Sequence, residues 1–474
     1  MSRLRNLLLI NEQPHGFGAG APVPTSGVSG EGGEAGGGSA AVAGGSGAAG
    51  TPPTDMLIGV DMNDFEDPST IVECQNFECF CRGLRGTYRG VNYCTLPSGQ
   101  FLRKAIRKEY RTLTDDERAR LHNAVNRLKS SKVYDHFHAL HYHYSYGSGI
   151  HGGPAFALWH REFIKRYEFA LRLIDPTIAI PYWDMTIDQI LPDPKDSIMW
   201  TADFMGSVDS NGYLNSGPFA SWVTLEVTNK ANYSDKQIQE RTVPIQKLGK
   251  KRIMRKLGSD FGNTLIADIN ITRIMTNSSI YLIFGDGQVG VENCSSLNWL
   301  GSEGGTLWIE KTLENIHGMV HQFVGGMGGD MGEFQTSVGD PVFFLLHGFV
   351  DLLFEMWRQL HQSRYERENT YREPNSRCHI SEHYLDTNMR PFMFQGAYIK
   401  NKDGLSNNYT DQFYEYESRP SCNVKNCSSK YLFCDNSKNQ RHCGVKIKVG
   451  GNCSGLLDSD GPCYNGWCRN LDGT

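Results

Sequence analysis

The chain has no long hydrophobic run and no excess of basic residues. None of its 474 residues lies in an apolar stretch that reaches the roughly 18 residues needed for a membrane-spanning helix. Lysine and arginine number 47 against 52 aspartate and glutamate residues, which gives a formal net charge of −5. We therefore expect no membrane span and no nucleic-acid partner, because nucleic-acid binding requires a concentrated positive surface. Hydrophobic residues (39%) and aromatic residues (11%) are still frequent enough to form a folded core.

Large apolar side chains are scarce near the N-terminus, where residues 15–54 consist mainly of glycine, alanine and serine. Such a segment cannot bury a core, so we expect residues 1–54 to be disordered. The rest of the chain is expected to form a cysteine-stapled lead-in at 55–105, a main helical domain at 106–400 and a cysteine-rich module at 401–474.

Cysteine is rare within the expected main domain and abundant on both sides of it. The 13 cysteines gather at residues 74–94 and 422–468, and only Cys294 and Cys378 lie between the two groups. Dense cysteines in loop-rich sequence predict disulfides that form in an oxidising compartment. A zinc site is the alternative, but the chain lacks two tight C-x-x-C pairs. The odd total leaves at least one cysteine unpaired or paired between chains.

Motifs for N-glycosylation point to the same compartment. They begin at Asn232, Asn270, Asn277, Asn293, Asn408, Asn426 and Asn452. The first residues, MSRLRNLLLINEQP, hold only four apolar residues in a row, whereas the hydrophobic region of a secretory leader has about 7 to 15. The cysteines and glycosylation motifs nevertheless predict a secreted, extracellular protein.

Apolar residues recur at helical spacing in segments 115–129, 132–145, 156–174 and 341–361, and a further helix is expected near residue 317. Thr114 or Asp115 can cap the first helix, and Pro341 suits the first turn of the last. The predicted fold is mainly α, an antiparallel helix-bundle core with irregular loops, short strands and disulfide-rich flanks. Residues 190–300 are expected to be irregular, with short strands such as SIYLIFG, and the helical pattern ends after about residue 400.

Histidines form two clusters in the expected bundle. In ENIHGMVH, His317 and His321 are four residues apart and therefore share one face of a helix. His347 follows in the apolar run DPVFFLLHGFVDLLFEMW, where an unpaired imidazole would be costly to bury. Asp351, one turn later, is expected to accept the second N–H of the His347 ring.

In the other cluster, His160 lies on the expected 156–174 helix and His151 lies in the glycine-rich loop before it. Spacing alone leaves the third ligand open among His136, His138, His141 and His143. Neutral imidazole suits copper, zinc, iron or nickel, so two triplets predict a pair of metal ions that face each other. Surface or core histidines are the alternative for either cluster. Histidines without such a setting are expected to be ordinary surface or structural residues: His122, His361, His379, His383 and His442.

The motifs around the clusters resemble those of the tyrosinases, a type-3 copper family, and of its animal branch in particular. YDHFHALHYHY resembles the first copper-binding helix of the family and favours His141. HGGPAFALWHREF resembles the segment that supplies His151 and His160, and IPYWDMT is similar to the family's PYWDW segment. HGMVH and DPVFFLLHGFVD resemble the second site, with ligands His317, His321 and His347. The resemblance covers roughly residues 70–400 and implies two copper ions, one for each triplet.

The resemblance also implies roles for residues beside the ligands. Glu314 matches a family glutamate that orders a water and helps to deprotonate a monophenol, but Gly318 stands where the family has an asparagine partner. Phe343 matches a phenylalanine that packs against the copper-site rings, and Phe334 is expected to overhang the pocket as a gate. Leu346 replaces a histidine that usually precedes the last ligand. The alternatives are a helix-terminal carboxylate for Glu314, core packing for Phe343 and a simply mobile loop for Phe334.

The reaction that the resemblance implies is copper-dependent oxidation of phenols by dioxygen, a tyrosinase or catechol oxidase activity. Gly318 favours o-diphenol oxidation over monophenol hydroxylation. The o-quinones produced would form melanin-like pigment or cross-link extracellular-matrix proteins. The cysteine-rich tail resembles those of molluscan tyrosinase-like proteins, which fits a matrix setting, and a structural staple is the alternative. The rival functions are an oxygen carrier similar to molluscan haemocyanin and a matrix protein whose metal site is weakened. Leu346, in place of the family's histidine, favours the second of these.

Overall fold

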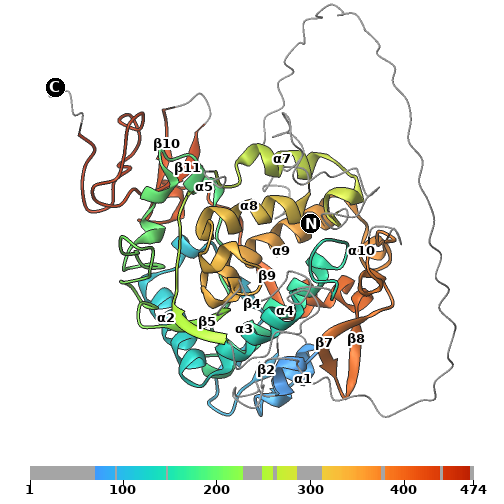
Figure 1. Cartoon of the computed structure of the whole chain (residues 1–474). Coiled ribbons are helices and arrows are strands. Elements are labelled where there is room, and N and C mark those ends of the chain that lie inside the picture. Colours follow the sequence, from blue (N-terminus) through green and yellow to red (C-terminus); the bar gives the residue numbers. More distant parts are fainter. Residues whose placement is uncertain are drawn as a thin grey trace, which may run out of the picture. The chain divides into compact units, whose positions relative to one another are not determined.

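The computed structural model describes residues 70–90, 93–145, 148–227, 248–259, 264–285, 312–374, 379–437 and 441–469 (Figure 1). All of these belong to one compact unit that spans Leu57–Thr474. The segment 1–54, predicted to be disordered, lies outside the described residues, as do Cys294 and Cys378. No helix in the described ranges is both long and apolar enough to cross a lipid bilayer.

Helices make up most of the regular structure, so the fold is mainly α as predicted. The α-helices are α1 (Phe77–Gly83), α2 (Asp115–Ser130), α3 (Val133–Tyr144), α4 (Phe156–Ile174), α5 (Thr186–Gln189), α7 (Asp268–Thr276), α8 (Leu313–Gly325), α9 (Val342–His361) and α10 (Arg364–Asn369). Short 3-10 helices are Thr70–Glu73, Tyr110–Thr112, Pro194–Asp196, Ile198–Trp200, Ile280–Leu282, Asp330–Gly332, Ser337–Gly339, Ser381–His383, Asn401–Leu405 and Lys425–Ser428, and Tyr409–Phe413 is a π-helical turn.

The five helices expected from the sequence all form, and local signals explain where they begin. Thr114 caps α2: its side chain accepts the backbone N–H of Glu117, whose carboxylate accepts the Thr114 N–H in return. This capping box satisfies donors that the first turn of a helix otherwise leaves open. Pro341 precedes the first residue of α9, where its missing N–H costs nothing.

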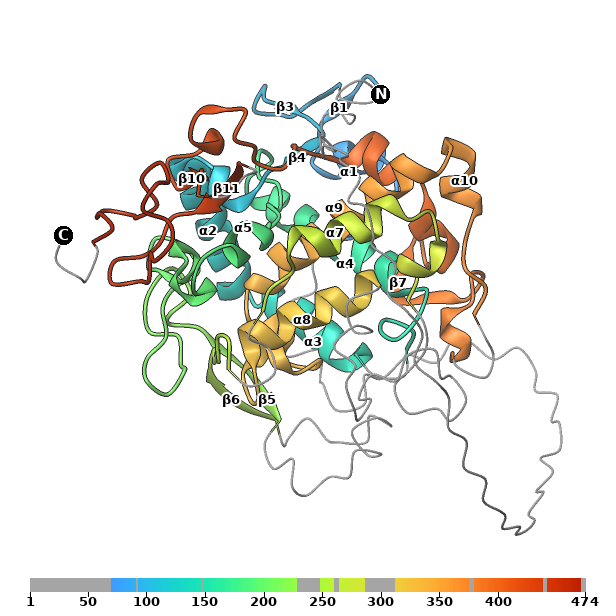
Figure 2. The same ribbon diagram turned by 90° about the horizontal axis from the view of Figure 1, so that it is seen from above.

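Helices α4 and α9 pack together at the centre of the fold, with α2 against α4 and α8 against α9 (Figure 1, Figure 2). Aromatic rings fill the contact between α4 and α9. Phe344 stacks on Tyr167, with ring centroids 3.5 Å apart, and lies 5.8 Å from Phe163. Nearly every residue of both helices is buried. These two helices therefore form the centre of the core, and each carries one of the clustered histidines, His160 on α4 and His347 on α9.

A buried ionic network also ties α4 to α9. Arg161 on α4 donates to Asp351 (2.6 Å) and Glu355 (2.8 Å) on α9. Arg107 joins Glu168 on α4 (2.9 Å) to Asp351 (3.1 Å). All these side chains are almost fully buried, and ionised groups are retained in such surroundings only when they are paired.

The strands are short and lie at the edges of the helical core. They are β1 (Thr87–Tyr88), β2 (Cys94–Thr95), β3 (Phe101–Leu102), β4 (Ala105–Arg107), β5 (Val223–Val227), β6 (Leu248–Arg252), β7 (Asn388–Phe394), β8 (Ala397–Lys400), β9 (Tyr414–Tyr416), β10 (Leu432–Asp435) and β11 (His442–Val445). β1–β2–β3, β5–β6, β7–β8 and β10–β11 pair antiparallel, whereas β4 and β9 pair in parallel. The β4–β9 pair joins the lead-in to the segment after residue 400.

Two local predictions are wrong. SIYLIFG was expected to be a strand, but Ile280–Leu282 is a 3-10 helix. Its backbone closes tight local turns, and Phe284 packs 5.8 Å from Phe354 of α9. A short apolar run cannot distinguish these conformations. Helical turns also occur beyond the expected limit near residue 400, at Asn401–Leu405, Tyr409–Phe413 and Lys425–Ser428.

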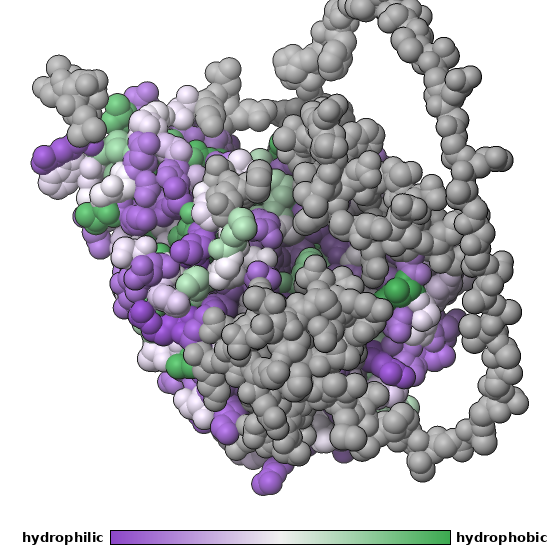
Figure 3. Space-filling model, in the orientation of Figure 1, coloured by the Kyte–Doolittle hydropathy of each residue, from purple (hydrophilic) through white to green (hydrophobic). Residues whose placement is uncertain are grey.

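The predicted disulfides are confirmed among the described cysteines. They join Cys74–Cys79, Cys81–Cys94, Cys422–Cys434, Cys427–Cys443 and Cys453–Cys468, and Cys463 is free. The glycosylation motif at Asn270 is inaccessible, because this side chain is 4% exposed and accepts the Ala267 N–H. The coloured part of the face in Figure 3 is mostly hydrophilic, with hydrophobic residues scattered over it.

Candidate metal centre

The structure brings the six predicted histidines together as two triplets. His141 (α3), His151 (the loop before α4) and His160 (α4) form the first; His317 and His321 (both α8) and His347 (α9) form the second. Within each triplet, one nitrogen from each ring lies within 4.8 Å of the others. This spacing is small enough for a single ion to be bound by three imidazoles.

The two triplets face each other across the α4–α9 contact. His160 and His347 stack with ring centroids 4.3 Å apart and an angle of 11° between the rings. His160 also lies 6.4 Å from His317. The packing of α4 on α9 therefore sets how far apart two bound ions would be.

Backbone carbonyls orient four of the six rings through Nδ1. These contacts are His151 to Ser145 (3.1 Å), His160 to Phe156 (2.9 Å), His317 to Glu314 (3.1 Å) and His321 to Met331 (2.8 Å). A proton on Nδ1 is needed to donate to a carbonyl, so Nε2 of each of these rings carries a lone pair for a metal ion. A carbonyl behind a metal-binding histidine commonly fixes the ring in this way.

Four of the six rings have a buried Nε2 atom with no hydrogen-bond partner in the described part of the chain. They are Nε2 of His141, His160, His317 and His347, each on a residue at most 3% exposed. A buried polar atom without a partner is costly, and a metal ion would remove that cost. The six rings therefore fit a pair of metal ions.

Burial also keeps the six imidazoles neutral, the form that binds metals. It lowers the pKa of His151 and of His321 to about 4. It lowers the pKa of the other four well below the ordinary value, with neighbouring histidines adding to the effect. Neutral rings need not lose a proton before they bind an ion at neutral pH.

The expected hydrogen bond from His347 to Asp351 does not form, because Asp351 is taken by other partners. Its carboxylate accepts from Arg161 (2.6 Å), Arg107 (3.1 Å) and Tyr416 (2.7 Å). Two guanidinium groups are stronger partners for a buried carboxylate than a neutral imidazole. Nδ1 of His347 has no partner among the described residues.

Glu314 and Gly318 both lie on α8, on either side of His317. The Glu314 carboxylate accepts the backbone N–H of Gly152 at 2.5 Å, across the site in the loop of the first triplet. Burial raises its pKa to about 7, although the N–H donors of Gly152 and Gly153 act in the opposite direction. Apart from its own helix backbone, no atom of the described residues lies within 4 Å of the position that a Cβ on Gly318 would occupy, so among these residues there is room for a larger side chain.

The predicted aromatic neighbours lie against the imidazoles. Phe343 on α9 is 4.1 Å from the His347 ring and 5.0 Å from the His141 ring, so it contacts both triplets. Phe334 is 47% exposed and lies 4.8 Å from the His151 ring, at the outer side of the site. Leu346, beside His347, is fully buried.

His383 was expected to be an ordinary surface or structural residue, and sequence reasoning did not anticipate its position beside the first triplet. It is fully buried and lies against the glycine loop that carries His151: a Cβ on Gly153 would be 2.7 Å from its Cε1. His379 lies on the same side, with its ring 5.5 Å from that of His383. The four-residue spacing of these two histidines was a signal, but nothing near them in sequence connects them to residue 151.

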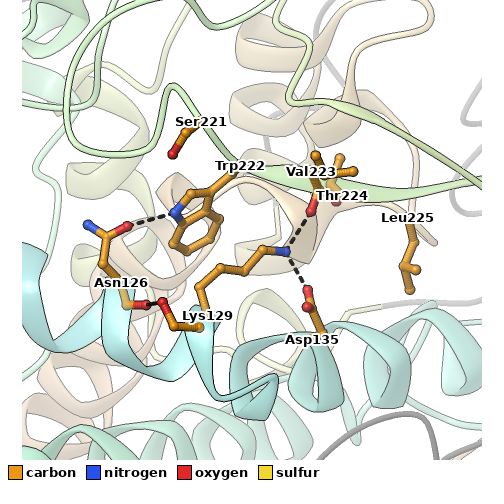
Figure 4. A pocket seen from close by; sticks show the side chains of 9 residues that line it. Asn126, Lys129, Asp135, Ser221, Trp222, Val223, Thr224 and Leu225 are labelled. Carbon is orange, nitrogen blue, oxygen red and sulfur yellow. Dashed lines mark hydrogen bonds and ion pairs between the residues drawn. The ribbon is translucent and has the colours of Figure 1, made fainter.

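A surface pocket of about 310 Å³ lies apart from the histidine triplets (Figure 4). Asn126 and Lys129 of α2, Asp135 of α3 and Trp222 are among its lining residues. The Lys129 ammonium already donates to Asp135 and to the Val223 carbonyl. Because the Lys129 ammonium is already paired, the pocket offers no open charge to a ligand. The histidine triplets are therefore the better candidate for the functional site.

Comparison with known proteins agrees with this geometry. Residues 131–360 match the family described as the common central domain of tyrosinase. A tyrosinase-like protein of Caenorhabditis elegans is 41% identical over 402 residues, which cover 85% of this chain and 51% of that protein. The chain thus spans about half the length of this relative. The tyrosinase of Streptomyces glaucescens is 28% identical over 54% of this chain and 83% of its own length. A tyrosinase-like protein of the mollusc Pinctada maxima is 28% identical over 67% of this chain and 62% of its own length.

The matched segment contains both histidine triplets together with Glu314, Phe334 and Phe343. The family uses a binuclear copper centre, and this chain offers one triplet for each copper ion. Residues 131–360 of this chain are therefore a tyrosinase-family domain.

Proposed function

We propose that the protein oxidises phenols with dioxygen, converting o-diphenols to o-quinones. The observation that carries this proposal is the stacked pair His160–His347, which brings the two triplets into one site. Buried ring nitrogens in both triplets have no hydrogen-bond partner among the described residues. The similarity to a bacterial tyrosinase supports it. Two o-diphenols give up four electrons and four protons, and one dioxygen takes them to become two waters.

The chain's own residues would hold the metals and position the phenol. Copper ions, when bound by the two triplets, supply dioxygen binding and accept electrons from the substrate. Phe343 packs against His141 of one triplet and His347 of the other, where its ring would help to exclude water. Phe334 stands partly exposed beside His151, where it restricts the size of a phenol that reaches the site. Glu314, with its pKa raised to about 7, is suited to accept a phenolic proton near neutral pH.

We propose further that diphenol oxidation exceeds monophenol hydroxylation. A monophenol must lose a proton that water alone removes poorly, and the family holds a water for this purpose between a glutamate and an asparagine. Gly318 supplies no side chain at the second position. A diphenol is the easier substrate for such a site.

The proposed setting is extracellular. The disulfides and the glycosylation motifs support secretion. Quinones react with side-chain nucleophiles without further catalysis, so matrix proteins would be cross-linked or pigment deposited wherever the enzyme acts. A small phenol and dioxygen are the direct partners in this proposal.

Copper content and oxygen uptake test the proposal together. The purified chain is loaded with Cu²⁺, desalted and assayed for copper per chain, and oxygen uptake is then followed with a simple catechol. Copper in both triplets with steady uptake and quinone absorbance supports the proposal. Reversible oxygen binding without turnover would instead favour a carrier. A chain that retains little copper would favour a matrix protein with a weakened site.

A further inference from the structure

The loop that carries His151 is held by elements far away in the sequence. It contains Gly149, Gly152 and Gly153 around the ligand. Gly149 and Gly152 both have positive φ values (+76° and +75°), a conformation that glycine adopts without strain. A loop of this composition has little stiffness of its own, so the position of His151 depends on what surrounds it.

One side of the loop packs against residues 379–383. A Cβ on Gly149 would lie 2.8 Å from the Glu382 carbonyl oxygen, and a Cβ on Gly153 would lie 2.7 Å from His383. The Ala155 N–H, just after the loop, points at Nδ1 of His383 at 3.5 Å. This wall blocks movement of the loop in one direction.

A second restraint comes from α8. Glu314 reaches from the first turn of that helix and accepts the Gly152 N–H at 2.5 Å, and the neighbouring Gly153 N–H also favours the ionised form of this carboxylate. The restraint on the loop is thus a hydrogen bond from its backbone to a side-chain oxygen of α8. The helix that supplies Glu314 also supplies His317 and His321 of the second triplet.

We propose that Glu314 is a positioning residue that couples the two metal sites, because its carboxylate on the helix of the second triplet holds the loop ligand of the first. In this role the carboxylate acts through the backbone of Gly152, and its oxygen atom matters more than its charge. The proposal rests on the proposed function only in taking the six histidines as metal ligands. It separates two tasks of one side chain, loop positioning and proton transfer.

Metal content distinguishes these tasks. Glu314→Ala removes the acceptor, whereas Glu314→Gln keeps a carbonyl oxygen for the Gly152 N–H but cannot serve as a base. Each variant is loaded with Cu²⁺ and, in a parallel series, with redox-silent Zn²⁺, then desalted and assayed for metal per chain. Glu366→Ala is the matched control, since Glu366 also accepts a backbone N–H in the first turn of a helix (Ser363, 2.7 Å) but lies on α10, outside both triplets.

We expect Glu314→Ala to fall from two ions per chain towards one, and Glu314→Gln and the control to keep two. Double variants identify the ion that is lost. Adding His141→Ala, which removes a first-triplet ligand, should cause no further loss, whereas adding His321→Ala should leave almost no metal.

Two results would overturn the proposal. One is full metal content in Glu314→Ala. The other is loss of the remaining ion when His141→Ala is added, which would mean that Glu314 supports the second triplet. Circular dichroism of each variant identifies those that fail to fold. Full metal content in Glu314→Gln would by itself show that this variant folds. A chain that binds two ions yet oxidises no phenol would contradict the proposed function and leave this proposal standing.

Discussion

At the scale of single residues, Gly318 is the position most open to change. In the part of the chain that the structure describes, no atom outside its own helix backbone lies within 4 Å of where its Cβ would be, so Gly318→Asn should fit without displacing a described neighbour. The new amide would lie one residue after His317 and on the same helix as Glu314, where it could help to hold a water. We expect monophenol hydroxylation to rise on the order of 10-fold relative to diphenol oxidation, a part of the roughly 10²- to 10⁴-fold that general base catalysis contributes.

Gly318→Ala is the control for this substitution, because it adds a side chain without an amide. Its ratio of monophenol to diphenol rates, measured from initial quinone formation, should stay at the wild-type value. An equal rise in both variants would attribute the effect to helix stiffening, and no rise in the asparagine variant would remove Gly318 as the cause of the diphenol preference.

His122 provides a pH test that does not involve the metal ligands. Its Nε2 lies 2.7 Å from the Tyr110 hydroxyl, and burial lowers its pKa to about 4, with the Arg118 charge as a smaller cause. In the unfolded chain the ring takes up a proton near its ordinary pKa of about 6.5, so acid favours unfolding. The resulting decrease in unfolding free energy is absent above a pH of about 6.5, grows as the pH falls, and levels off below a pH of about 4.

His122→Gln should remove that dependence. On account of His122 alone, the unfolding free energy of the wild type should be roughly 2 kcal/mol lower at about pH 5 than at about pH 7.5. Urea unfolding of both proteins at both pH values measures the difference, and contributions from the shared histidines cancel. Parallel stability curves for the two proteins would show that His122 titrates normally in the folded state.

At the scale of elements, the sequence predicts helices well and their mutual contacts poorly. Helical periodicity and caps such as Thr114 are local signals, and they locate α2, α3, α4, α8 and α9. The ligand pair on α8 follows from the same periodicity. The Glu314–Gly152 contact joins residues 162 positions apart, and Asp351 finds its partners on α4 and β4. No local pattern encodes such pairs, so the wrong partner of Asp351 and the unanticipated position of His383 beside the His151 loop have the same cause.

The ionic network between α4 and α9 gives a prediction at this scale. Asp351→Asn would leave Arg161 and Arg107 with less compensation in a fully buried position. Breaking one partner of a buried pair costs about 3 to 5 kcal/mol, because the remaining charge stays desolvated. Since α4 carries His160 and α9 carries His347, copper should also dissociate faster.

The matched control is Asp116→Asn on α2. Asp116 pairs with Arg120 at 2.9 Å, but its side chain is 78% exposed, and such pairs contribute only about 0 to 1 kcal/mol. Denaturant unfolding and the rate of copper transfer to a chelator measure both variants. Similar losses for the two substitutions would show that the buried network does not hold α4 against α9.

At the scale of the whole molecule, the cysteine-rich C-terminal segment packs against the helical domain. The Tyr431 hydroxyl accepts from Arg118 on α2 (2.9 Å) and donates to Asp115 (2.5 Å), and its ring lies 4.9 Å from Phe204. Further along, the Ile198 N–H donates to the Lys446 carbonyl at 3.0 Å. These contacts cross the expected boundary at residue 400, so we expect the C-terminal segment to unfold together with the helices.

Tyr431→Ala tests this cooperative unfolding. The side chain is 3% exposed, and removing a buried aromatic ring costs about 3 to 5 kcal/mol. If the segment and the helices unfold as one unit, calorimetry should show a single transition whose midpoint falls in the variant. Trp467→Ala, in the same segment but 72% exposed, should change the unfolding free energy by only about 0.5 kcal/mol or less. A separate low-temperature transition that alone responds to Tyr431→Ala would mean that the segment is an independent module, held to the helical domain by too few contacts to share its stability.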